Sequence, residues 1–308
     1  MSKIEINCKN YSNFRRIGQG SYGTVFRAID KKNGHYVSIK EMIKDRYHEP
    51  KEILQNEVEI MEKMKNENSV NIKEVIESND YYYIVMEYCE YNLEDYLNLK
   101  REKPLTINEI KEVLNQLNNT FKIMQKEKII HRDLKLSNIL ICLDKLDKII
   151  VKLSDYGSSK VMSTKLMSSA GTPLTMSPEV LKEEKESINS KSDIWSLGIL
   201  IYYMLFKEYP YNGNREYQIL KDIESNKKLK LCSDDKLNDL LDKMLKIKVN
   251  ERLSWEDYFN HPFFEQAISN KAFSFWITLI LFFLFLFLFF IRIIIIMNYI
   301  NLGYYKAS

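Results

Sequence analysis

The fold of this chain is decided by one short stretch, which reads His131-Arg132-Asp133-Leu134-Lys135-Leu136-Ser137-Asn138. Apolar runs flank it on both sides, at residues 128–130 and 139–141. A polar loop held between two buried strands presents its side chains in fixed positions, as a reaction site requires. Asp133 can accept a proton from a hydroxyl, Lys135 can neutralise a phosphate, and Asn138 can offer an amide oxygen to Mg²⁺. Any one of these residues alone would indicate only a charged surface loop.

The whole pattern, His-Arg-Asp-Leu-Lys-x-x-Asn, resembles the catalytic loop of eukaryotic protein kinases of the serine/threonine type. The resemblance covers the chain from about Phe14 to Phe264. It implies an α+β fold with two lobes, namely a small antiparallel-sheet N-lobe with one helix at about 14–88 and a mainly helical C-lobe at about 89–264. It also implies ATP and Mg²⁺ as cofactors and protein substrates as partners. The loop and the C-lobe distantly resemble unc-51-like kinases as well.

Composition agrees with one large domain. The chain has 308 residues, of which 45% are hydrophobic, enough for a sizeable core. The net charge of +3 is too balanced for a nucleic-acid-binding protein. Residues 1–13 form a polar lead-in without the apolar segment of a signal peptide. The cysteines show no metal-ligand spacing, so we expect free thiols in a reducing compartment at Cys8, Cys89, Cys142 and Cys232.

A glycine-rich segment lies near the start of the proposed domain, at residues 17–28. A lone GxGxxG pattern is weak, since a tight hairpin also collects glycines. Apolar β-forming residues flank this one and no helix pattern follows it, which argues against a dinucleotide-binding turn. Two strands with a glycine tip let backbone N–H groups approach phosphate oxygens. By resemblance, ATP is expected to contact Gly18, Gln19, Gly20, Ser21, Tyr22, Gly23 and Val25.

The strand-like segment that ends at Lys40 follows this hairpin. Alternation places Ser38 and Lys40 on the strand face beneath the glycines. By resemblance, Lys40 binds the α- and β-phosphates of ATP and has a catalytic role, while Ser38 lines the adenine where the family usually has alanine. Helical periodicity covers residues 51–66. On that helix Glu57 matches the catalytic glutamate that pairs with the lysine, with Glu59 as the rival.

The adenine pocket is expected at the end of a strand over residues 81–87. By resemblance, backbone groups of Glu87 and Cys89 hydrogen-bond the adenine, and Leu140 belongs to the ATP-binding residues. The segment of Glu87 and Cys89 is the hinge between the two lobes. The Gly-Gly-Asp sequence that usually follows the hinge in the family is absent. The ribose contact is therefore unassigned.

The sequence Asp155-Tyr156-Gly157 lies 22 residues after Asp133. It resembles the Asp-Phe-Gly magnesium site, with tyrosine in place of phenylalanine, so Asp155 and Asn138 are the expected metal ligands. Asp133 and Lys135 are then the expected catalytic residues of the loop. The hydroxyl of Tyr156 must find a partner or water.

Residues 158–170 are rich in serine and threonine and have no apolar periodicity, which is typical of a mobile activation loop. Ser168 stands three residues before Gly171 and is the candidate for regulatory phosphorylation, with Ser169 next. By resemblance, Lys135 and Thr172 imply a preference for serine or threonine substrates.

Several residues are expected to build the C-lobe without touching the substrate. Thr106 and Glu109 form a capping box before a long amphipathic helix that runs to about residue 128. By resemblance, Asp193 on a buried helix hydrogen-bonds the backbone of the catalytic loop. By the same resemblance, Arg252 pairs with Glu179.

The C-terminal part of the chain reads as a membrane anchor. Residues 272–291 contain 20 residues without a charge, about 30 Å as a helix. We therefore expect a linker at 265–271, a transmembrane helix at 272–297 and a short tail at 298–308, with the kinase domain in the cytosol. The alternative is translated non-coding sequence, since AT-rich DNA encodes the same residues, and the protein would then be cytoplasmic.

These observations together predict an ATP- and Mg²⁺-dependent protein serine/threonine kinase, with no nucleic-acid partner. The alternative is a pseudokinase that serves as a binding scaffold. A pseudokinase is expected to lack one of the four residues Lys40, Asp133, Asn138 and Asp155, and the chain retains all of them. A third interpretation treats the protein mainly as a membrane-tethered recruiter.

Overall fold

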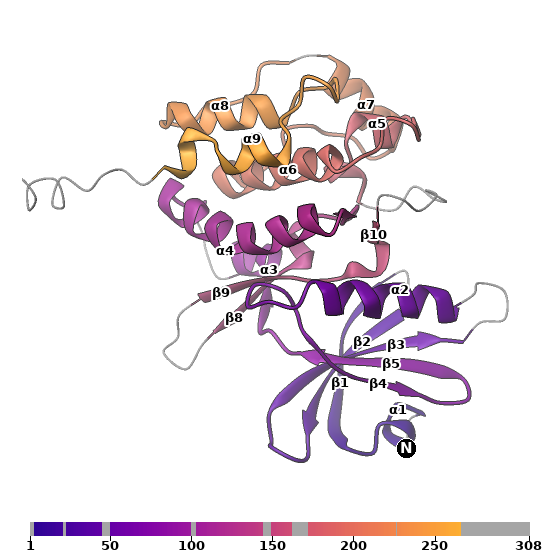
Figure 1. Ribbon diagram of the computed structural model, residues 1–308. Helices are drawn as coiled ribbons and strands as arrows, with labels where there is room; N and C mark the ends of the chain where they lie inside the picture. The colour runs from indigo at the N-terminus through magenta and orange to yellow at the C-terminus, as the bar shows by residue number, and fades with distance from the viewer. Residues whose placement is uncertain are drawn as a thin grey trace, which may run out of the picture. The chain divides into compact units, whose positions relative to one another are not determined.

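A computed structural model describes residues 3–20, 23–44, 50–99, 103–143, 149–161, 172–225 and 227–265 (Figure 1). The sequence predictions for Ser21, Tyr22, Ser168 and the apolar segment 272–297 lie outside these residues. Residues 1–264 belong to one compact unit. Within the described part of the chain, no helix combines the length and the apolar character needed to cross a bilayer.

The N-lobe is built on a five-stranded antiparallel sheet in the order β1-β2-β3-β5-β4. Its strands are β1 (Tyr11–Gly20), β2 (Gly23–Asp30), β3 (Tyr36–Ile43), β4 (Ile72–Glu77) and β5 (Tyr81–Glu87). Helix α2 (Pro50–Lys63) lies beside this sheet and places Ile60 and Met61 in the core (Figure 1). The glycine hairpin and the helix predicted at 51–66 are therefore both present.

The N-terminal segment differs from the expected polar lead-in at residues 1–13. Helix α1 (Lys3–Asn7) precedes β1, and β1 begins at Tyr11. Ile4, Cys8 and Tyr11 are at most 6% exposed and pack with the sheet residues Val37 and Ile39. The three apolar residues are spread among polar ones, so their burial depends on the sheet that they cover. Ile4, Cys8 and Tyr11 are thus part of the N-lobe core.

The C-lobe is mainly helical, as the resemblance implied. Its helices are α3 (Leu93–Leu99), α4 (Ile107–Lys126), α5 (Pro178–Leu181), α6 (Lys191–Phe206), α7 (Glu216–Glu224), α8 (Asp235–Met244) and α9 (Trp255–Phe259). Short strands carry the polar loops: β6 (Tyr91–Asn92), β7 (Ile129–Ile130), β8 (Ile139–Leu143), β9 (Ile149–Leu153) and β10 (Lys160–Val161). Strands β6, β8 and β9 form one sheet and β7 pairs with β10.

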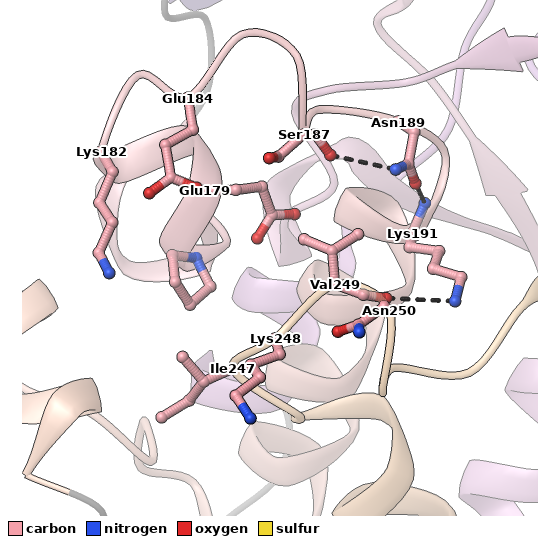
Figure 2. A pocket seen from close by; sticks show the side chains of 11 residues that line it. Glu179, Lys182, Glu184, Ser187, Asn189, Lys191, Ile247, Lys248, Val249 and Asn250 are labelled. Carbon is pink, nitrogen blue, oxygen red and sulfur yellow. Dashed lines mark hydrogen bonds between the residues drawn. The ribbon is translucent and has the colours of Figure 1, made fainter.

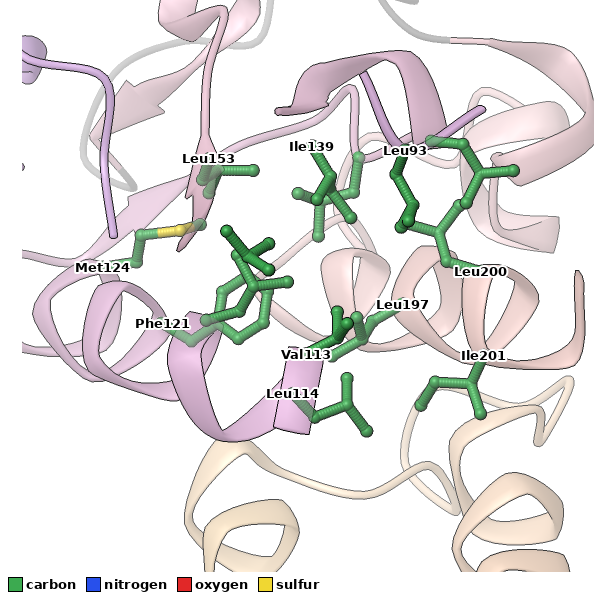
Figure 3. Packing of buried hydrophobic residues seen from close by; sticks show 14 of the residues in the cluster. Leu93, Val113, Leu114, Phe121, Met124, Ile139, Leu153, Leu197, Leu200 and Ile201 are labelled. Carbon is green, nitrogen blue, oxygen red and sulfur yellow. The ribbon is translucent and has the colours of Figure 1, made fainter. Parts of the chain in front are cut away.

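The core of the C-lobe lies between α4, α6 and the strands β8 and β9. Figure 3 shows Leu114 and Phe121 of α4 in the same cluster as Leu197 of α6 and Ile139 of β8. Helix α6 is buried along nearly its whole length. Because β8 is packed on several sides, the catalytic-loop residues 131–138, which lead into it, end at a fixed strand.

The cysteines correct one expectation. Cys89 and Cys142 form a disulfide, with their Cα atoms 4.6 Å apart, so the prediction of free thiols is wrong for these two residues. The hinge segment runs alongside β8, where Tyr91 pairs with Ile141, and this pairing brings the two cysteines together. Cys8 and Cys232 are free thiols, and Cys8 is fully buried.

Candidate active site

The catalytic-loop residues 131–138 lie between β7 and β8, and α6 holds their backbone. The Asp193 carboxylate accepts hydrogen bonds from the backbone N–H groups of His131, at 2.7 Å, and Arg132, at 2.9 Å. Arg132 has a positive φ of 71°, an uncommon conformation for a residue with a side chain. Burial raises the pKa of Asp193, with the imidazole of His131 and the two N–H groups acting against that shift. The contact expected between Asp193 and the loop is present.

Asp133 is at the centre of the loop and only 8% exposed. Lys135 Nζ lies 2.8 Å from one carboxylate oxygen, and Thr172 Oγ1 donates to the other at 3.2 Å. Asn138 donates from Nδ2 to the Asp133 backbone carbonyl at 2.9 Å and to its carboxylate at 3.2 Å. These contacts hold the Asp133 carboxylate in one orientation.

Lys40 on β3 is buried and contacts two carboxylates. Its Nζ is 2.6 Å from Glu57 Oε1 on α2 and 3.3 Å from Asp155 Oδ1. Burial acts against the charge of Lys40, but the two carboxylates outweigh it and raise the pKa of Lys40. The rival residue Glu59 is on the outer side of α2, where it pairs with Lys63. The lysine therefore contacts Glu57, as the resemblance implied, and not Glu59.

Asp155 begins the segment that follows β9. Its backbone is left-handed, with φ 61° and ψ 70°. Lys40 lowers the pKa of Asp155, although burial acts in the opposite direction. A Cβ atom on Gly157 would lie 3.2 Å from Lys40 Nζ and 3.3 Å from Glu57 Oε2. These contacts would be tight, so glycine leaves room for the ion pair of Lys40 and Glu57, a role that the sequence did not reveal.

The glycine hairpin covers the same region of β3. Gly20 pairs with Gly23 across the tip, Gly18 pairs with Val25, and Val25 pairs with Lys40 on β3. A Cβ atom on Gly23 would collide with the backbone carbonyl of Glu41, so that this position requires glycine. The register places the predicted phosphate-binding backbone next to Lys40.

The predicted adenine-binding residues also come together. Ser38 is the register partner of Met86 on β5, one residue before Glu87. Strand β6, just after Cys89, pairs with β8 so that Asn92 is opposite Leu140. Ser38 thus lies beside the end of β5, and Leu140 lies opposite the strand that begins two residues after Cys89.

Sequence reasoning missed the support behind this hinge. The Glu87 carboxylate accepts a hydrogen bond from Asn71 Nδ2 at 2.6 Å and lies 2.9 Å from Lys152 Nζ. These two residues engage the carboxylate, so the predicted contact with adenine involves the backbone of Glu87 and not its side chain. One signal was available in the sequence: Lys152 is a lone charge in the apolar strand β9, Ile149–Leu153.

A separate pocket of about 600 Å³ lies in the C-lobe and contains none of the predicted site residues (Figure 2). Glu179 lines it, and Arg252 Nη1 and Nη2 donate to the Glu179 carboxylate at 2.7 and 2.9 Å. Lys191, another lining residue, donates to the Val249 carbonyl at 3.2 Å. The ion pair expected between Arg252 and Glu179 is present, and it stabilises the C-lobe away from the catalytic loop.

Comparison with known proteins adds a family to this geometry. The family model described as "Protein kinase domain" matches residues 11–264. The serine/threonine-protein kinase atg1 of Dictyostelium discoideum is 32% identical over 259 residues, which cover 80% of this chain and 38% of that protein. Calcium-dependent protein kinase 4 of Plasmodium falciparum is 32% identical over 272 residues, 85% of this chain and 50% of that protein.

The serine/threonine-protein kinase unc-51 of Caenorhabditis elegans is 31% identical over 274 residues, which cover 82% of this chain and 31% of that protein. The chain thus spans from about a third to one half of the length of these curated relatives. The similarity to unc-51 and atg1 agrees with the distant resemblance noted from the catalytic loop.

Proposed function

The chain belongs to the protein kinase family, and from this premise we propose that it transfers the γ-phosphoryl group of ATP to serine and threonine hydroxyls of protein substrates. The observation that carries the proposal is the single charge cluster formed by Lys40, Glu57 and Asp155 beside an oriented Asp133. The curated relatives named serine/threonine-protein kinases support the substrate class.

Asp133 would orient the attacking hydroxyl and accept its proton. Its carboxylate is held by Lys135 and Thr172, so little reorganisation is needed when a hydroxyl arrives. Lys135 is 29% exposed in its side chain, in reach of a phosphate that approaches from solvent. Holding the two reactants in line is the larger part of catalysis in this reaction class.

Lys40 would hold the α- and β-phosphates. Glu57 keeps its ammonium group in place, and the raised pKa of Lys40 keeps that group charged. The backbone of the glycine hairpin, next to Lys40 in register, would contribute N–H groups to the phosphates.

Asn138 and Asp155 are the residues that would hold Mg²⁺. Asn138 uses its Nδ2 group as a donor to Asp133, which leaves the amide oxygen as an acceptor. An amide oxygen and a carboxylate are hard ligands that fit Mg²⁺, which proteins often bind through one or two such groups together with substrate phosphates. When bound, Mg²⁺ would neutralise charge on those phosphates.

The test is phosphorylation of a serine/threonine peptide library by the purified chain with ATP and Mg²⁺. The Asp133→Asn variant should lose nearly all turnover and keep its affinity for ATP, because Asp133 contacts the hydroxyl and not the nucleotide. Asp242→Asn, on the exposed face of α8, is the matched control and should behave like the wild type. ATP binding without phosphorylation of any peptide by the wild type would favour the pseudokinase alternative.

We further propose control by phosphorylation at Ser168, on sequence grounds alone. A phosphate on Ser168 adds a charge of about −2. It could bridge Arg132 and Lys160 and so order the segment at residues 158–170. Ser168→Ala should lower activity, and Arg132→Ala should remove any gain from phosphorylation. Unchanged activity in Ser168→Ala would contradict this site and leave Ser169 to be tested.

The uncharged run at residues 272–291 supports a third proposal, a single C-terminal membrane anchor with the kinase domain in the cytosol. Carbonate extraction of the native protein, with and without residues 272–308, is the test. The full chain should stay with the membrane and the shortened chain should not. A full chain that washes off the membrane, or a mature protein that ends before Ala272, would contradict the anchor and also the interpretation as a membrane-tethered recruiter.

A further inference from the structure

Tyr156 takes the middle position of Asp155-Tyr156-Gly157, where the resemblance implies phenylalanine. Its side chain is 1% exposed and its ring lies 5.5 Å from the imidazole ring of His131. Its hydroxyl oxygen lies 2.7 Å from Ser69 Oγ, and Ser69 is fully buried. Its other neighbour, the Leu153 carbonyl, is 3.5 Å away, at the limit of a hydrogen bond. Ser69 is therefore the main partner of a hydroxyl that has no access to water.

The segment that carries Ser69 is itself tied to β9. Val70 N–H donates to the Leu153 carbonyl, and Leu153 N–H donates to the Asn68 carbonyl, both at 2.9 Å. Thr120 Oγ1 on α4 also donates to the Asn68 carbonyl at 2.9 Å. Ser69 Oγ is thus presented from a fixed backbone next to the strand that leads to Asp155.

Asp155 needs such support because few direct contacts hold it. Its side chain is 42% exposed, its ion pair with Lys40 is 3.3 Å long, and its backbone is in the left-handed region that disfavours residues with a side chain. An outlier of this kind persists when neighbouring residues determine the position of the chain. Tyr156 is the neighbour whose side chain is wholly buried.

We propose that Ser69 is a positioning residue for Asp155: its hydroxyl holds the hydroxyl of Tyr156, and Tyr156 in turn keeps Asp155 where it can bind Mg²⁺. This inference rests on the proposed function. It names a residue outside the Asp155-Tyr156-Gly157 motif that supports the metal ligand Asp155. Ser69 touches neither metal nor nucleotide and acts only through Tyr156.

Removing the Ser69 hydroxyl and removing the Tyr156 hydroxyl should have unequal effects on ATP binding with Mg²⁺. The two effects should not be additive. Ser69→Ala leaves the Tyr156 hydroxyl buried with only the distant Leu153 carbonyl as a partner. Conformations in which Tyr156 moves toward water therefore become more populated. Tyr156→Phe removes the Tyr156 hydroxyl and leaves the Ser69 hydroxyl, which is on a short side chain and can turn toward a backbone carbonyl. The double variant contains neither hydroxyl and leaves no buried group unpaired.

The experiment measures the Kd of the full chain for ATP by calorimetry, with Mg²⁺ and with EDTA. Ser69→Ala should raise the Kd for ATP with Mg²⁺ about tenfold, the size expected for one unpaired buried hydroxyl. The Kd for ATP in EDTA should change much less, because Ser69 acts through Asp155, whose contact with Lys40 is the long ion pair at 3.3 Å. Tyr156→Phe should have a smaller effect, about threefold, and the double variant should bind within about twofold of the wild type.

Thr120→Val is the matched control. It removes a buried hydroxyl that holds the same segment through Asn68 but does not touch Tyr156. It should lower thermal stability and leave the ratio of the two Kd values unchanged. An equal loss of affinity with and without Mg²⁺ in Ser69→Ala, or an equal change of the ratio in Thr120→Val, would overturn the positioning role.

A second measurement needs no nucleotide. Ser159 N–H donates to the Tyr156 carbonyl at 2.9 Å, so its hydrogen exchange reports on the Tyr156 backbone. Exchange should be faster in Ser69→Ala than in the double variant, and equal rates would overturn the coupling. A wild-type chain that binds no ATP would contradict the proposed function, whereas unchanged Mg²⁺ dependence in Ser69→Ala would contradict the positioning role alone.

Discussion

At the scale of single residues, Arg252 and Glu179 form a buried ion pair. Arg252 and Glu179 have side-chain exposures of 0% and 2%, and their two groups form a double hydrogen bond. Ser192 Oγ donates to the same carboxylate at 2.8 Å. Arg252 lowers the pKa of Glu179, although burial alone would raise it. The unfolding free energy therefore depends on the protonation state of Glu179, and so on pH.

Glu179→Gln should show that link. The folded-state pKa of Glu179 lies below its ordinary value of 4.5, so the unfolded chain binds more protons as the pH falls below that value. The stabilisation by the pair is therefore complete above pH 4.5 and is lost as the pH falls through the folded-state pKa. At pH 7 the variant should lose about 3 kcal/mol of unfolding free energy, because the Arg252 charge stays buried without its partner.

Urea unfolding of both proteins at pH 7, 5 and 4 is the measurement. The difference in unfolding free energy should shrink toward acid. Glu251→Gln, which removes the exposed partner of Lys248, is the control and should cost less than about 1 kcal/mol. A difference for Glu179→Gln that does not change with pH would contradict the linkage.

At the scale of elements, helix α4 is stabilised both by a local capping box and by packing of its side chains in the core. Thr106 Oγ1 accepts from the Glu109 N–H at 3.3 Å, and the Glu109 carboxylate accepts from the Thr106 N–H at 2.7 Å. The capping box predicted from the sequence is present. Leu114, Leu117 and Phe121 on the same helix are fully buried. Packing of these side chains contributes more to stability than the cap does.

Thr106→Ala should lower the unfolding free energy by about 1 kcal/mol, the usual effect of losing an N-cap side chain. Leu117→Ala should cost about 2–5 kcal/mol, because it removes buried apolar volume. Thermal or urea unfolding distinguishes the two. Thr106→Ser retains a capping hydroxyl and should remain within about 0.5 kcal/mol of the wild type. A loss in Thr106→Ala as large as in Leu117→Ala would contradict this division.

At the scale of the whole kinase domain, the hinge joins the two lobes and is held from both sides. Lys152 and Asn71 hold Glu87, and the disulfide links Cys89 to Cys142 on β8. These contacts come from the N-lobe, from β9 and from β8. The segment expected to bind adenine is therefore positioned by residues of both lobes.

Alkylation of the native protein with iodoacetamide should distinguish the cysteines. Without reductant, Cys232 should react, since Cys89 and Cys142 are joined and Cys8 is buried. Burial also raises the pKa of Cys8 to about 12, which keeps it a thiol. After treatment with dithiothreitol, Cys89 and Cys142 should become labelled, as mass spectrometry of the peptides can show. Labelling of Cys89 before reduction would contradict the disulfide.

Features that depend on nearby residues could be predicted from the sequence alone. Three such features are the glycine hairpin, the capping box at Thr106 and the loop at residues 131–138. They are local, because short-range spacing determines hydrogen bonding within a turn or a loop. The fold class followed from these patterns and from the family resemblance. The contact between Lys40 and Glu57 was implied by the family resemblance, with Glu59 as the rival.

The tertiary structure alone decided the contacts between residues with no local pattern. Ser69 and Tyr156 are 87 residues apart, and Cys89 and Cys142 are 53 residues apart. The burial of Ile4 and Cys8, and the space that Gly157 leaves open beside Lys40, likewise depend on elements that come from elsewhere in the chain. A buried hydroxyl or carboxylate must find a partner, but only the packing of the strands determines which residue that partner is.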